Sequence, residues 1–119
     1  MPTYVIRLNE TTEEYITWST VADAPVSHPM TRAEMLYHLT TKVTGEPAEQ
    51  MLARTDLTGT SCHHDPELNL PPLGHWENKG FVLQRSEGLY WLPRHNLTAY
   101  VHATITGSNR NPITYLESI

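Results

Sequence analysis

The chain opens on alternating apolar and polar positions, a pattern typical of β-strands. Every second residue is apolar within residues 3–8 and again within 13–20, at Tyr4, Ile6, Leu8, Ile16 and Trp18. The residues between these two runs, 9–12, are polar and suited to a turn. The pattern predicts an N-terminal β-hairpin.

A helical period follows a loop that contains two prolines. Thr31 and Glu34 have the spacing of a capping box, in which each side chain accepts a backbone N–H of the other residue. Met35, Leu39 and Val43 then recur at intervals of four, and Gly45 suits the helix end. A helix is therefore predicted from Thr31 to Thr44.

A second, shorter helix is predicted after Pro47, which suits a first-turn position. It extends through about Arg54 and is anchored by Met51 and Leu52. From residue 56 to residue 80 the periodicity stops, and three prolines and three glycines interrupt the chain. This stretch predicts a long irregular loop, which Trp76, Leu68, Leu70 and Leu73 would hold against the rest of the protein.

The C-terminal part predicts further strands. Residues 80–85 and 89–93 flank a turn at Ser86–Gly88, residues 98–106 alternate, and residues 113–116 form a last short apolar run. The predicted fold class is α+β: an N-terminal β-hairpin, one or two helices, C-terminal antiparallel strands and a long irregular loop at 56–80. A length of 119 residues supports a single domain over 1–119.

Composition narrows the partners. The chain has 8 basic and 13 acidic residues, a net charge of −5, and its basic residues are scattered. Nucleic-acid binding needs a cationic cluster, so no nucleic acid is expected as a partner. Apolar runs are too short for a membrane span, and no signal peptide is visible. A single Cys excludes an internal disulfide, and these features together predict a soluble cytoplasmic protein.

One stretch concentrates potential metal ligands. Within residues 62–77 these are Cys62, His64, His75 and Glu77, and zinc takes thiolate, imidazole and carboxylate ligands. Such a site could organise the domain or serve a metal-dependent hydrolase or nuclease. The alternative is that these loop histidines cap turns and meet solvent, because no pair has the spacing that characterises zinc motifs.

Large aromatic side chains are numerous for a modest core. Most should be buried, but exposed ones would mark a protein interface, where Trp and Tyr act as anchors. The candidate interaction residues are Trp18, Trp76, Trp91 and Tyr90. The common hydrolase, P-loop and dinucleotide-binding signatures are missing, which favours a non-enzymatic role.

Three motifs carry a resemblance over about residues 3–36. They are Trp18-Ser19-Thr20, Asp23-Ala24-Pro25-Val26, and Met30-Thr31-Arg32 with Glu34. In this order they resemble the start of many small uncharacterised accessory proteins encoded by actinobacteriophages. The resemblance implies a phage gene product that acts in the cytoplasm of an actinobacterial host, and it implies no catalytic residues.

The leading hypothesis is a non-enzymatic phage accessory protein that binds a host or phage protein. One alternative is a zinc-binding domain or metal-dependent enzyme that uses the loop at 62–77. A second alternative is a minor structural component of the virion.

Overall fold

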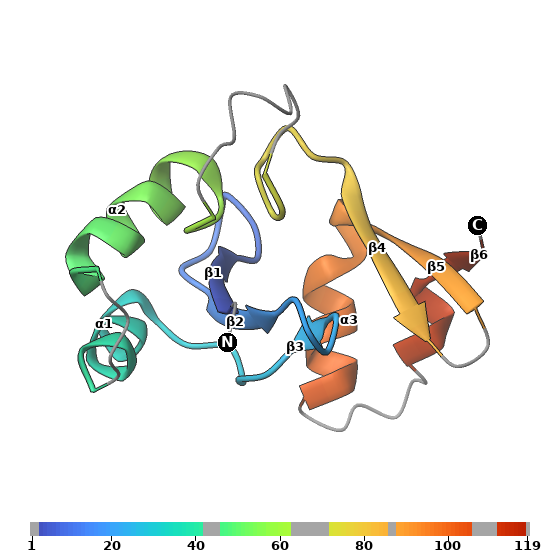
Figure 1. Ribbon diagram of the computed structural model, residues 1–119, viewed down its shortest axis with the longest axis horizontal. Coiled ribbons are helices and arrows are strands. Elements are labelled where there is room, and N and C mark those ends of the chain that lie inside the picture. Colours follow the sequence, from blue (N-terminus) through green and yellow to red (C-terminus); the bar gives the residue numbers. More distant parts are fainter. Residues whose placement is uncertain (1–2, 42–45, 63–71, 86–87, 106–111, 119) are drawn as a thin grey trace.

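Two small antiparallel sheets and three α-helices make up the described part of the chain, which confirms the α+β prediction (Figure 1). The computed structural model describes residues 3–41, 46–62, 72–85, 88–105 and 112–118. Within these ranges, no helix has the length and apolar content that crossing a membrane requires.

The predicted N-terminal hairpin is present. It is formed by β1 (Thr3–Arg7) and β2 (Tyr15–Ser19), paired antiparallel. A two-residue strand, β3 (Ala24–Pro25), adds to the free edge of β2. The sequence did not predict β3, because prolines disfavour strands. At the edge of a sheet a proline is tolerated, because no neighbouring strand needs the backbone N–H that proline lacks.

The β1–β2 hairpin is covered on both faces. Figure 1 places the helices α1 (Arg32–Thr40) and α2 (Ala48–Thr58) on one side of it, and the helix α3 (Leu97–Ile105) with the second sheet on the other. The core on the α1–α2 side contains Val5, Tyr15, Met30, Met35, Leu39, Met51 and Leu52. The core on the α3 side contains Ile6, Leu8, Ile16, Trp18, Phe81, Leu83, Leu92, Leu97, Tyr100 and Val101.

Helix α1 begins at the predicted capping box. The Thr31 hydroxyl accepts the Glu34 N–H at 3.2 Å, and the Glu34 carboxylate accepts the Thr31 N–H at 2.9 Å. The helix ends at Thr40 instead of Thr44. The hydroxyls of Thr40 and Thr41 donate to the Tyr37 and His38 carbonyls of the last turn, which disfavours continuation of the helix. Val43, the last residue of the predicted apolar stripe, and Gly45, the predicted helix end, lie outside the described residues.

Helix α2 is longer than predicted, and Pro47 precedes it as the N-cap. It runs four residues past Arg54, so the start of the predicted irregular loop is helical. The helix ends at Gly59, which has a φ of +92° and whose N–H bonds to the Thr55 carbonyl. Trp76 packs at this helix end, and its backbone N–H donates to the Thr58 carbonyl at 2.8 Å.

The docking of the loop on the protein is thus confirmed at Trp76, and Leu73 also packs on the core. Leu68 and Leu70 lie outside the described residues.

The second sheet contains the two predicted strands, β4 (Gly80–Arg85) and β5 (Gly88–Pro93), and the short β6 (Glu117–Ser118). The predicted strand over 98–106 is wrong: a 3-10 turn (Arg94–Asn96) leads into α3. Leu97, Tyr100 and Val101 have the i, i+3, i+4 spacing of one helix face, and that face is buried. The predicted strand over 113–116 is wrong too, because Pro112–Tyr115 form a 3-10 turn before β6.

One carboxylate connects the α1–α2 layer to the hairpin. Asp56 on α2 accepts hydrogen bonds from the Tyr15 hydroxyl and from Nε of Arg32 at 2.8 Å. Nη1 of Arg7 lies 3.7 Å from the same carboxylate. Burial, followed by the hydrogen bond to Asp56, raises the pKa of Tyr15 to about 12. Asp56 thereby joins β1, β2, α1 and α2.

This network predicts a specific pH dependence. Because the folded state holds the Tyr15 proton up to about pH 12 while the unfolded chain releases it near pH 10, stability should fall as the pH rises between these values. Tyr15→Phe should remove that part of the alkaline loss and cost about 1–2 kcal/mol near neutral pH. Denaturant unfolding at several pH values measures both, and Tyr37→Phe, at an exposed position, should change neither.

The end of α2 generates a second prediction. An added Cβ at Gly59 would lie 2.8 Å from the Trp76 ring and 2.9 Å from the Gly74 carbonyl oxygen, at a positive φ. Gly59→Ala should therefore lower the free energy of unfolding by about 2–4 kcal/mol. Gly88→Ala is the control: its φ is +134°, but no atom lies within 4 Å. Equal losses for both variants in chemical denaturation would show that Trp76 does not press on this turn.

Candidate functional site

Three of the four predicted metal ligands, Cys62, His75 and Glu77, belong to the described residues. His64 lies outside the described residues. Cys62 is partly buried and interacts with the Tyr4 hydroxyl. This interaction is the largest cause that raises the pKa of Tyr4, and burial of the hydroxyl is the second. Within the described ranges, no three His, Cys, Asp or Glu side chains are placed to hold one metal ion.

His75 has a structural task in its turn. Its Nδ1 accepts the Glu77 N–H at 3.0 Å, and its carbonyl accepts the Asn78 N–H at 2.9 Å. A neutral imidazole that accepts at Nδ1 carries its proton on Nε2. In a neutral imidazole bound to a metal through Nε2 the proton is on Nδ1, which then cannot accept the Glu77 N–H, so this turn and metal binding by His75 compete.

The four predicted interaction residues divide between the core and the surface. Trp18 is 1% exposed and stacks on Phe81 at a centroid distance of 4.9 Å, which makes it a core residue and removes it from the accessible surface. Trp76 is half-buried between Gly59 and Arg94. Tyr90 is also half-buried and pairs with the buried Leu83, which places Tyr90 on the core side of the second sheet.

Trp91 lies on the opposite face of that sheet. It pairs with Val82, and an added Cβ at Gly80 would touch its ring at 2.5 Å, so the indole covers Gly80. Val82 is 55% exposed, and Leu89, two residues before Trp91 on the same face, is 52% exposed. Val82, Leu89 and Trp91 lie on the hairpin formed by β4 and β5, and we call them the apolar patch of the hairpin. Gln84 and Glu117, the cross-strand partners of Leu89 and Trp91, border it.

Sequence reasoning did not single out Val82 and Leu89. The available signal is that the strands at residues 80–85 and 89–93 carry apolar side chains on both faces. A sheet with one buried face needs them on only one. A strand of this kind is either buried on both faces or exposes an apolar face. The structure shows the second case for this hairpin.

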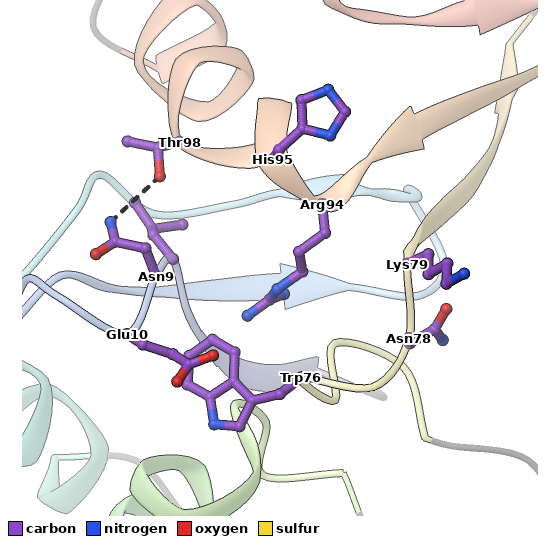
Figure 2. Close-up of a pocket in the computed structure, with 9 residues that line it drawn as sticks. Asn9, Glu10, Trp76, Asn78, Lys79, Arg94, His95 and Thr98 are labelled. Carbon is purple, nitrogen blue, oxygen red and sulfur yellow. Dashed lines mark hydrogen bonds between the residues drawn. The ribbon is translucent and has the colours of Figure 1, made fainter.

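A pocket of about 510 Å³ opens where β4 begins and β5 ends (Figure 2). Three segments form its wall: the end of the β1 region, the turn before β4, and the turn that leads into α3. The lining residues are Leu8, Asn9, Glu10, Trp76, Asn78, Lys79, Arg94, His95 and Thr98.

Arg94 is the central side chain of this pocket. Its guanidinium lies 4.7 Å from the centroid of the Trp76 ring, and Figure 2 shows the two side chains pointing toward one another. Its Nη2 donates to the Arg7 carbonyl at 2.7 Å, and its backbone N–H donates to the Lys79 carbonyl at 2.8 Å. Burial lowers the pKa of Arg94 to about 10, and the charge on Glu10 opposes that shift. Arg94 therefore stays a cation at neutral pH.

A scan against protein-family models, a search of curated proteins and a search of solved structures found no significant match for this chain.

Proposed function

We propose that this protein is a small, non-enzymatic phage accessory protein that acts by protein–protein interaction in the cytoplasm of an actinobacterial host, and that the apolar patch of the hairpin is its contact surface. The observation that carries the proposal is the side-by-side exposure of Val82 and Leu89 next to Trp91. The phage context rests on the resemblance over residues 3–36.

The arrangement of the patch supports this role. Other exposed apolar side chains, such as Val21 and Leu57, belong to different elements, whereas the patch residues are neighbours across one strand pair. Paired strands hold the three side chains in fixed positions, so little conformational entropy is lost when a partner covers them. An apolar centre bordered by polar side chains is the usual composition of a binding surface.

The charge around the patch indicates the kind of partner. Glu117 borders Trp91, and the whole chain carries a net charge of −5. Complementary charge steers association and disfavours wrong partners. We therefore expect a partner that inserts an apolar side chain beside Trp91 and surrounds it with basic residues.

The two alternatives keep distinct expectations. A zinc-binding domain or metal-dependent hydrolase using Cys62, His64, His75 and Glu77 requires His75 to give up its hydrogen bond with the Glu77 backbone. A minor virion component would use the same patch against another virion protein. In that case the partner found at the patch would be a structural protein of the particle.

Site-specific cross-linking tests the proposal. A photoreactive amino acid at Leu89, with the protein expressed in phage-infected actinobacterial cells, should give one discrete adduct. The same probe at Leu57, which is 79% exposed on α2, should not give that adduct. Val82→Lys should lower the yield at Leu89 by about tenfold or more, because a buried charge replaces an apolar contact, while Val21→Lys should leave it unchanged.

Two results would contradict the proposal: no adduct at Leu89, or the same adduct from Leu57. An adduct with a particle protein, together with detection of the chain in purified virions, would instead support the structural alternative.

A further inference from the structure

The pocket of Figure 2 is a locally cationic region in an acidic protein. Lys79 and Arg94 line it together with the imidazole of His95 and a single carboxylate, that of Glu10, while the chain as a whole has a net charge of −5. The amide side chains of Asn9 and Asn78 add polar groups to the same wall. A concave site with a fixed cation is suited to a small anion.

Arg94 lacks an acceptor that a buried guanidinium requires. Its Nη1 is buried and has no hydrogen-bond partner among the described residues, although Nη2 bonds to Arg7. A buried donor without an acceptor loses its hydration without compensation, and the loss is larger when the donor is charged. The Trp76 ring gives the cation a favourable contact but takes no conventional hydrogen bond from it.

The nearby carboxylate does not fill this role. Within the described residues, no ion pair joins Glu10 to Arg94, and Glu10 is exposed on the turn after β1. Its charge nevertheless acts on Arg94 through space. Glu10 therefore does not supply the missing acceptor, and its charge repels any anion that approaches the pocket.

We propose that this pocket binds a small molecule through a phosphate or carboxylate group, with Arg94 as the anchor, Lys79 as a second cation at the exposed rim, and Glu10 as a charge that weakens binding. Both groups present the paired oxygens that a guanidinium recognises best. The volume of about 510 Å³ falls within the range of small-molecule sites, about 300–1,000 Å³.

The site is independent of the proposed protein interface. Arg94 packs its guanidinium 5.9 Å from the ring of Phe81, on the core side of β4, whereas the patch lies on the outer face of that strand. Either site can be correct without the other.

The test follows the indole N–H resonance of Trp76 in nitrogen–proton correlation spectra while inorganic phosphate, acetate or chloride is added at constant ionic strength. Phosphate, acetate or both should shift Trp76, and the resonances of Trp18 and Trp91 should stay in place because these residues lie outside the pocket lining. Chloride should have no effect. The anion that saturates at the lower concentration identifies the ligand class.

Three variants give the proposal its sharpest test. Glu10→Gln should tighten binding by about three- to tenfold by removing a repulsive charge, and Lys79→Gln should weaken it by a similar factor. Arg94→Gln should abolish binding. Glu49→Gln, which makes the same change of net charge at an exposed position of α2 outside the pocket lining, is the matched control and should leave affinity unchanged.

Unchanged Trp18 and Trp91 resonances report that a variant is folded. If Arg94→Gln does not fold, Glu10→Gln and Lys79→Gln still decide the matter, because both residues are exposed. The proposal is overturned if no oxyanion shifts Trp76, if all three indoles shift together, or if Glu10→Gln and Glu49→Gln bind alike.

Discussion

Burial of the β1–β2 hairpin on both faces is the constraint on which the rest of the structure depends. All five residues of β2 are buried, so each face of this short sheet needs its own covering layer. Ile16 and Trp18 face α3 and the second sheet, whereas Tyr15 faces α1 and α2. The second face carries a hydroxyl into the interior, and Asp56 satisfies it. The helices and the second sheet thus take positions that the two faces of β2 define.

Local signals explain which elements the sequence predicts correctly. The Thr31–Glu34 capping box and the alternation of β1 and β2 are properties of neighbouring residues, and both appear as predicted. Residues 97–105 fit both a strand pattern and a helix pattern. Every second residue from Ala99 to Ile105 is apolar, and Leu97, Tyr100 and Val101 also share a helix face. Thr, Val and Tyr favour a strand locally. The surface offered by the central hairpin and the second sheet decides for the helix, and that surface is built from distant segments.

The candidate sites divide in the same way. Composition makes Trp91 a candidate interaction residue, but the exposure of Val82 and Leu89 follows from strand register, which fixes the face each side chain occupies. Arg94 gives no signal in the sequence, where it is one arginine among scattered basic residues. Its burial arises because Trp76 and the Arg7 carbonyl, remote from it along the chain, converge on its guanidinium.

Arg94 also connects the pocket to the packing of the whole protein. Its Nη2 donates to the carbonyl at the end of β1, and its backbone N–H donates to the carbonyl of the residue before β4, so one residue ties the central hairpin to the second sheet. The cost of its buried charge is borne by the folded state alone, because the unfolded chain hydrates the guanidinium. An anion that reaches Arg94 lowers that cost only when the chain is folded, and ligand binding therefore stabilises the junction between the two sheets. Anion binding at the pocket and folding of the surrounding core are therefore thermodynamically linked.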